Sequence, residues 1–228
     1  MTLRPVTYDG DIKTVVDNYN ALAMDEKTGK YWDNIELYNI KKHIKDHYLK
    51  VQNYTCVYCQ QKIIVKHGMA WDTEHIIPKS LYPQFLFTEE NLSVACKDCN
   101  LIKLDKNILL NPKRKTFPKN SEDYLIVHPH FDEYFEHIKV ISDNQIYLPI
   151  DDKGKNTIEV CGLLRFAYQY TEYGKNDTSI KIEKRIVKLA DELINASTPF
   201  ETGFIIDCLK DLKDEYNKTI RDEYLKDL

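Results

Sequence analysis

Two cysteine pairs of the same spacing constrain this chain most strongly. Each has the form Cys-x-x-Cys, first at Cys56 and Cys59 and again at Cys96 and Cys99. A turn of this spacing presents two thiolates to one ion, and zinc takes four ligands in a tetrahedron. We therefore predict a closed four-thiolate zinc site. Such a site has no open coordination position, so it stabilises the fold rather than performing catalysis.

Two other interpretations of these cysteines are four unrelated buried thiols and a redox Cys-x-x-Cys. A redox site would have one pair near a βαβ unit, and none is evident. The chain has 228 residues and six cysteines, and its N-terminus has no apolar stretch typical of a secretory signal. We therefore expect a cytoplasmic protein with reduced thiols. Cys161 and Cys208 fall in apolar helical patterns and are expected to be small buried residues.

The segment between the cysteine pairs holds the groups that suit catalysis. It contains Glu74-His75 followed by Ile-Ile-Pro, and later Asn91. The apolar pair after His75 would anchor a strand in the core and Pro78 would end it, so His75 should lie at a strand end. A lone histidine there is more often a core residue. The neighbouring carboxylate and the carboxamides of Asn91 and Asn100 favour a catalytic interpretation instead.

These residues resemble the HNH endonuclease family. The resemblance covers about 50 residues and rests on motifs that occur together: Cys56-Val57-Tyr58-Cys59, Glu74-His75-Ile76-Ile77-Pro78, Asn91-Leu92 and Cys96-Lys97-Asp98-Cys99-Asn100. It implies a ββα-metal fold whose base is held by zinc.

The resemblance also implies roles for single residues. His75 would be the general base that takes a proton from water, and Asn91 would brace the loop and orient the histidine. Glu74 and Asn100 would bind one catalytic Mg²⁺ or Mn²⁺, since oxygen ligands favour such hard ions over zinc. The acidic position is Glu where Asp is also common in the family, and Asn100 replaces a final histidine.

Charge is distributed unevenly along the chain. The net charge is −4, but residues 96–119 hold seven basic and two acidic residues, a local net of +5. A basic patch beside a metal site suits a phosphate-bearing substrate, although an ordinary solvated surface has the same composition. Lys79 and Lys103 are candidate phosphate contacts. His128, His130 and His137 suggest a second metal site, but packing and surface roles explain them more simply.

The pattern of apolar residues predicts an α+β fold in which the ββα core is embedded in N- and C-terminal helices. No apolar run is long enough for a membrane span. We expect an N-terminal helical region over 1–54, the HNH module over 55–110, and a hairpin plus helices over 111–228. The expected elements are helices at 11–25 and 34–51, strands at 70–76 and 92–95, a helix from Asn100, a hairpin at 139–148 with its turn at Asp143–Asn144, a turn at 152–155, a helix from Thr157, as its N-cap, to Tyr168, and helices at 180–196 and 202–226.

The predicted function is a metal-dependent DNA endonuclease. The layout of helices around the module is also similar to the stand-alone HNH proteins of prokaryotic defence loci, such as the nuclease subunits of Septu-type and retron-linked anti-phage systems. That similarity implies an ATPase partner docked on the flanking helices. The alternatives are a restriction-type or mobile-element HNH nuclease, and a zinc-stabilised binding module that has lost catalysis.

Overall fold

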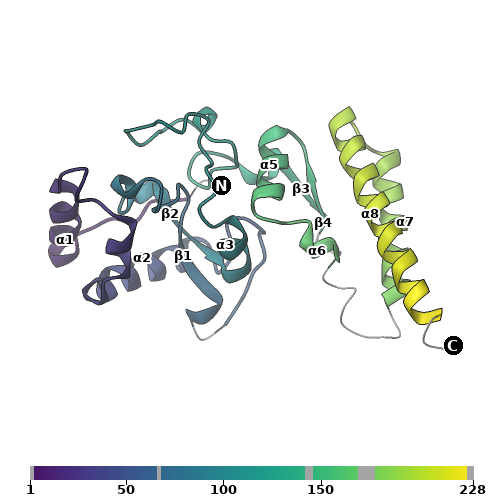
Figure 1. The fold of residues 1–228 in the computed structure, drawn as a ribbon, viewed down its shortest axis with the longest axis horizontal. Helices are drawn as coiled ribbons and strands as arrows, with labels where there is room; N and C mark the ends of the chain where they lie inside the picture. The colour runs from purple at the N-terminus through teal and green to yellow at the C-terminus, as the bar shows by residue number, and fades with distance from the viewer. Residues whose placement is uncertain (1–2, 66–67, 142–145, 169–177, 225–228) are drawn as a thin grey trace. The chain divides into compact units, whose positions relative to one another are not determined.

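The chain folds as two units in the computed structural model, which describes residues 3–65, 68–141, 146–168 and 178–224 (Figure 1). The first unit holds Met1–Tyr134 with Val160–Gly162, and the second holds Phe135–Glu159 with Leu163–Leu228. The predicted ranges 1–54 and 55–110 thus fall in the same unit. Within the described ranges, no helix has the length and apolar character needed to cross a membrane.

An antiparallel hairpin followed by a short helix forms the centre of the first unit. Strand β1 (Trp71–His75) pairs with β2 (Leu92–Cys96), with Trp71 opposite Cys96 and His75 opposite Leu92. Helix α3 (Lys97–Lys103) follows β2 directly. The predicted strands and the ββα order are confirmed. The predicted helix start at Asn100 is wrong, because the helix begins at Lys97 without a side-chain cap that a sequence pattern would reveal.

The N-terminal helices belong to this same unit. Helix α1 (Gly10–Ala21) confirms the first predicted helix, although it ends four residues early. The next predicted helix begins as a 3-10 turn, in which the Asn34 side chain accepts a hydrogen bond from the Glu36 N–H, and continues as α2 (Tyr38–Val51). Apolar residues spaced by four along α2 are buried, and α2 packs against β1 and β2. Short 3-10 segments lie at Gly29–Asp33, Ile35–Leu37, Gly68–Ala70, Pro83–Phe85, Glu89–Asn91 and Ser121–Asp123.

The second unit begins at Phe135, the second residue of the short helix α4 (Tyr134–His137), and continues with a hairpin of β3 (Ile138–Ile141) and β4 (Ile146–Pro149). The hairpin is confirmed, while its predicted turn at Asp143–Asn144 lies outside the described residues.

Helix α5 (Asp152–Val160) corrects two expectations about the chain that follows β4. The predicted turn at 152–155 is helical, and Thr157 is no N-cap, since its hydroxyl donates to the Lys153 carbonyl inside the helix. Gly162 has a φ of +60°, a left-handed conformation that ends the helix. The predicted helix to Tyr168 is therefore interrupted, and α6 (Arg165–Tyr168) is separate.

Two long helices complete the second unit. Helices α7 (Thr178–Ile194) and α8 (Pro199–Tyr224) confirm the last two predicted helices and pack against each other. Their apolar residues form one core with β4, which includes Ile146, Leu148, Leu189, Ile205, Cys208 and Leu212. The α+β fold class is confirmed.

Candidate functional site

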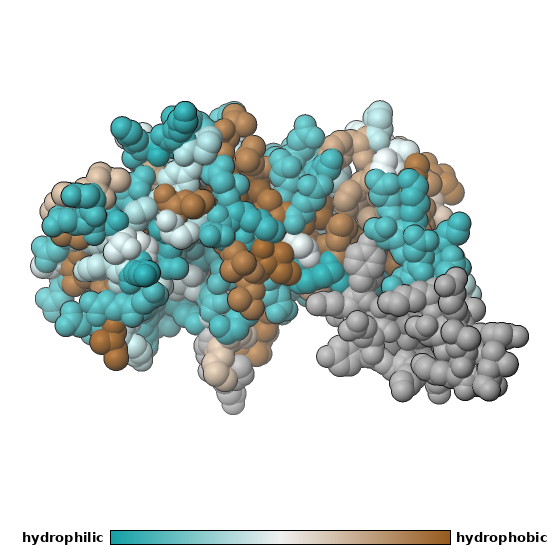
Figure 2. Space-filling view, in the orientation of Figure 1, coloured by the Kyte–Doolittle hydropathy of each residue, from teal (hydrophilic) through white to brown (hydrophobic). Residues whose placement is uncertain are grey.

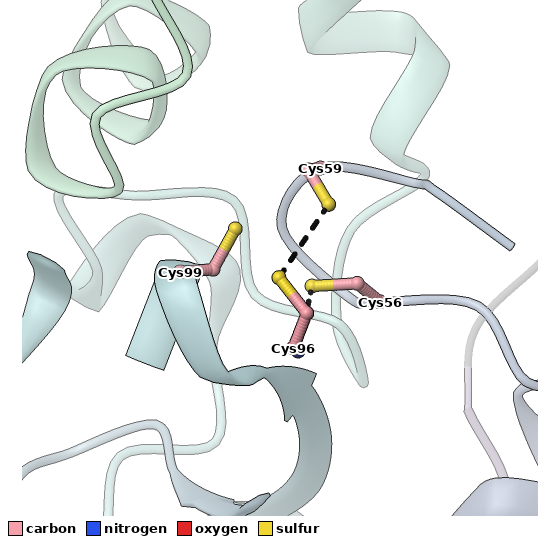
Figure 3. Close-up of side chains that lie close together, drawn as sticks. All are labelled: Cys56, Cys59, Cys96 and Cys99. Carbon is pink, nitrogen blue, oxygen red and sulfur yellow. Dashed lines mark hydrogen bonds between the residues drawn. The ribbon is translucent and has the colours of Figure 1, made fainter. Parts of the chain in front are cut away.

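The four paired cysteines converge on one point (Figure 3). Cys56 and Cys59 come from the loop after α2, Cys96 ends β2, and Cys99 lies in the first turn of α3. Their sulfur atoms all lie within 4.8 Å of one another, and all four residues are buried. The predicted gathering of these cysteines into one cluster is therefore confirmed.

The geometry of the cluster suits a metal ion rather than a disulfide. The Sγ atoms of Cys59 and Cys96 are 3.9 Å apart, far beyond the roughly 2.05 Å of a disulfide. Four sulfur atoms about 2.3 Å from a tetrahedral zinc would be separated by about 3.8 Å. Burial raises the pKa of the Cys56 thiol, so buried thiolates here need a bound cation to offset their charge.

A cavity of about 410 Å³ lies over the end of β1 and the side of α3. Glu74 and His75 line it from β1, Asn100 from α3 and Lys79 from the following loop. Four of the predicted site residues thus share one cavity, although Lys79 comes from outside the ββα elements.

His75 is held in a defined orientation and tautomer at this cavity. Its Nε2 is 3.1 Å from the Leu86 carbonyl, and its ring meets Trp32 edge-on with centroids 4.6 Å apart. A carbonyl only accepts, so Nε2 must carry the proton, and Nδ1 is the basic nitrogen of the neutral ring. Burial, and then the charge of Lys79, lowers the pKa of His75 to about 3, so the ring is neutral at physiological pH.

Asn91 is fully buried behind the cavity and ties together the loop that follows His75. Its Oδ1 accepts from the Ile77 N–H at 2.7 Å, and its Nδ2 donates to the carbonyls of Ile77 and Phe85 at 3.2 and 3.1 Å. Since Phe85 precedes Leu86, the same loop that Asn91 fixes carries the carbonyl that orients His75. Asn91 itself does not line the cavity, so its predicted bracing role would act through the loop.

Glu74 is buried in a charge-balanced cluster. Its Oε1 lies 2.6 Å from the Lys103 ammonium and accepts from the Tyr58 hydroxyl at 2.9 Å. Among the described residues, Glu74 Oε2 makes no hydrogen bond. The carboxylate therefore keeps one oxygen available while the other is fixed by two partners.

Lys103 differs from its expected surface position. Its side chain is 1% exposed, and it also donates to the His75 carbonyl at 3.2 Å. The ammonium of a lysine buried in this way cannot reach a bound phosphate, so Lys103 is not a phosphate contact. Its partners instead make it the residue that joins α3 to the two consecutive site residues of β1.

Asn100 pairs with an aspartate that the sequence pattern did not single out. Its Nδ2 donates to Asp72 Oδ2 at 3.0 Å, and Lys97 donates to Asp72 Oδ1 at 3.0 Å. With its amide nitrogen on Asp72, the Asn100 oxygen remains as an acceptor. Asp72 precedes Glu74 by two residues on one strand, so both side chains lie on the same face of the sheet. This alternation is the sequence signal that could have indicated Asp72. No comparable signal indicated Trp32, which lies far earlier in the chain.

The three histidines do not form a second metal site in the described part of the chain. The ring nitrogens of His130 lie against two carbonyl oxygens, with Nε2 2.8 Å from that of Leu92 and Nδ1 3.3 Å from that of Leu3, and the His128 ring stacks on Phe131. His137 belongs to the other unit and pairs with Asp151. Packing therefore accounts for these residues, as the simpler interpretation predicted.

Comparisons with known proteins agree with this geometry. The HNH endonuclease family matches residues 56–106, which contain both cysteine pairs, β1, β2 and α3. The chain is also 31% identical over 123 residues to the Septu protein PtuB of Bacillus thuringiensis. The match covers 54% of the chain and 42% of the relative, so less than half of the relative's length is represented. Residues 56–106, with their ββα core and a four-cysteine cluster that could hold a metal, therefore form an HNH domain.

Proposed function

We propose that the protein is a metal-dependent endonuclease that hydrolyses DNA phosphodiester bonds in a prokaryotic anti-phage defence system of the Septu type. The observation that carries this proposal is the single cavity lined by Glu74, His75 and Asn100. It joins a neutral imidazole to carboxylate and carboxamide oxygens, which are the groups needed to accept a proton from water and to hold a hard divalent ion.

His75 is the general base of this proposal. Nε2 keeps its proton and donates to the Leu86 carbonyl, so Nδ1 accepts the proton from the attacking water. Asn91 and Trp32 keep the ring in this orientation, one through the loop and the other through direct ring contact. These two are positioning residues, because neither would touch the reacting atoms.

Glu74 Oε2 and Asn100 Oδ1 would hold the catalytic ion, Mg²⁺ or Mn²⁺. When bound, such an ion supplies positive charge beside the phosphate as negative charge develops in the transition state. Tyr58 and Lys103 keep the Glu74 carboxylate in place by fixing its other oxygen. Lys79, at the cavity wall, would contact a neighbouring phosphate.

The four cysteines would hold zinc. An all-sulfur, buried donor set with near-tetrahedral separations suits zinc, and it leaves no position for water or substrate. The zinc would therefore fix the end of β2 and the start of α3, which carry Asn100.

The cellular setting in this proposal is the cytoplasm, beside an ATPase partner that controls the nuclease. The similarity to a Septu protein supports this setting over a restriction-type or mobile-element nuclease. The helices flanking the HNH module would be the docking surface. Recovery of the tagged protein from its native host without an ATPase would count against this part.

The test of the chemistry is cleavage of supercoiled and single-stranded DNA with Mg²⁺, Mn²⁺ or EDTA. His75→Ala should lower the cleavage rate by about 10²–10⁴-fold, the usual contribution of a positioned general base, while bound zinc stays unchanged. His130→Ala is the matched control, because His130 is also buried, with Nε2 2.8 Å from a carbonyl oxygen, but does not line the cavity. Equal cleavage by native protein and His75→Ala would contradict the proposal. DNA binding without any metal-dependent product would favour the catalytically inactive binding module.

A further inference from the structure

A second hollow, of about 590 Å³, adjoins the cavity on the side of α2. The two hollows share part of their lining, including Trp32, Lys79 and Asn100. The rest of the second lining comes largely from α2, which contributes Lys41, Lys42 and Lys45. A ligand that occupies the second hollow therefore continues directly into the proposed catalytic cavity.

The positive charge extends further along the same helix. A third hollow, of about 630 Å³, is lined by Arg4 and by Lys42 and Lys50 of α2. Lys42 belongs to both hollows, so the two are adjacent. We name the basic residues along this path the α2 strip: Arg4, Lys41, Lys42, Lys45, Lys50 and Lys79. Figure 2 shows that the surface over α2 is mostly hydrophilic.

The charge of the α2 strip contrasts with that of the cavity it leads to. Six basic residues line the second and third hollows against two acidic ones, Asp46 and Asp72, a net of +4. The cavity lining has one basic residue, Lys79, against Glu74 and Asp105, and the charge of Glu74 is balanced by the buried Lys103, so the cavity has no excess of positive charge. A polyanion is therefore favoured along the basic path beside the cavity.

The basic segment at 96–119 has a different arrangement from the one its composition suggested. Lys103 is buried against Glu74, and ion pairs join Lys97 to Asp72, Arg114 to Asp123 and Lys119 to Glu90. None of the basic residues of this segment lines any of the three hollows. Its charge is therefore partly neutralised by ion pairs, and it does not contribute to the lining of these hollows.

Lys41 and Lys42 of the α2 strip also have partners, but these are weak competitors for phosphate. Lys42 pairs with Asp46 one turn along α2, with both side chains about half exposed, and Lys41 donates to the Asn34 carbonyl. Exposed pairs of this kind contribute roughly 0.2–1 kcal/mol or less. A DNA phosphate can replace them, because several lysines then act on one polyanion with release of its counterions.

We propose that the DNA backbone lies along the α2 strip and enters the catalytic cavity past Trp32 and Lys79. This inference rests on the proposed nuclease function and names its substrate-binding surface. The 14 residues of α2 span about 21 Å at ~1.5 Å per residue. At about 3.4 Å per nucleotide along one strand, that length accommodates about six nucleotides.

The test compares two variants that remove the same charge. Lys41→Gln with Lys42→Gln removes two of the six positive charges of the α2 strip, and Lys113→Gln with Lys115→Gln removes those of two exposed lysines of the 96–119 segment. Glutamine retains helix propensity. Binding of a short fluorescein-labelled DNA duplex is measured by anisotropy against salt concentration, with EDTA present and in the His75→Ala background. These conditions exclude cleavage, so the measured DNA affinity can be interpreted even if the proposed catalytic role of His75 is wrong.

The α2 variant should bind DNA about tenfold or more weakly at ~0.1 M salt, and its log K against log[salt] slope should be shallower by roughly 2, about 0.9 for each lost phosphate contact. The 113/115 variant should retain the parent affinity and slope. Unchanged binding by the α2 variant would overturn the proposal. So would equal or greater loss in the 113/115 variant, or absence of DNA binding by the parent.

Discussion

The cysteine cluster and the cavity are built from the same short stretch of backbone but differ in every chemical respect. The cluster takes a residue from β2 and the cavity takes residues from β1, and both take one from the first turn of α3. Cys99 and Asn100 are therefore consecutive residues that belong to different regions. The cluster is buried, uses only sulfur and is closed. The cavity is open, presents oxygen and nitrogen, and balances the charge of Glu74 with an internal lysine.

This difference indicates that the ion of the cysteine cluster should be a permanent part of the fold, whereas the ion of the cavity should exchange with solvent. In the proposed zinc site, the charge of four buried thiolates would be balanced by the bound ion. Lys103 already balances the charge of Glu74, so an incoming divalent ion would compete with that ammonium. Replacement of single residues in the two regions should therefore have separable consequences.

The largest effect is expected from the cluster. Cys56→Ser should leave the module without cooperative folding and with less than stoichiometric zinc, because zinc binding in small modules contributes roughly 10–16 kcal/mol. Circular dichroism on heating and zinc analysis would measure both. Cys208→Ser is the control, since Cys208 is a buried thiol outside the cluster. A stable, active Cys56→Ser protein would show that the cluster is not structural.

A smaller loss of stability is expected at the cavity, where the Lys103 ammonium balances the charge of Glu74. Lys103→Met leaves the Glu74 carboxylate buried and unpaired, which should lower the free energy of unfolding by about 3–5 kcal/mol. Mn²⁺ should restore part of this loss if Glu74 is an ion ligand, and thermal unfolding with and without Mn²⁺ measures it. Lys97→Met, which removes an exposed pair with Asp72 from the same helix, should change stability by less than about 1 kcal/mol. A Mn²⁺ effect no larger than that of the native protein would argue against Glu74 as a ligand.

The smallest effects are expected from two buried carboxamide side chains, one that holds the loop behind the cavity and one that holds the backbone beside the cysteine cluster. Asn91 fixes the loop behind His75, whereas Gln52 joins Thr55, next to the first cysteine, to Val94 of β2. Asn91→Ala and Gln52→Ala should each cost on the order of 3 kcal/mol, through buried backbone groups left unpaired. At a temperature where both remain folded, only Asn91→Ala should slow cleavage. Equal slowing by both variants would mean that Asn91 supports the fold without positioning His75.

The sequence could predict those features that depend on residues close together along the chain. The Cys-x-x-Cys turns and the strand patterns depend on residues a few positions apart, and they led to the cluster, the hairpin and the last two helices. Gly154 suggested a turn, yet it lies in α5, where a Cβ atom would come within 1.9 Å of the His137 carbonyl. Its small size permits close packing rather than a bend.

The errors at the site came from contacts between distant residues. Lysine is rarely buried, so Lys103 was expected at the surface. Its burial depends on Glu74, which lies on another element. Trp32 reaches His75 because the 3-10 segment Gly29–Asp33 packs on the loop after β1, where a Cβ at Gly29 would lie 2.6 Å from the Lys79 carbonyl. No local pattern encodes such an approach.

The separation of a structural ion from an exchangeable one is tested most directly by measuring zinc content and DNA cleavage on the same sample during brief EDTA treatment. Cleavage should stop while one equivalent of zinc remains bound, and addition of Mg²⁺ alone should restore it. Loss of cleavage only in proportion to loss of zinc, or cleavage that persists in EDTA, would contradict the account.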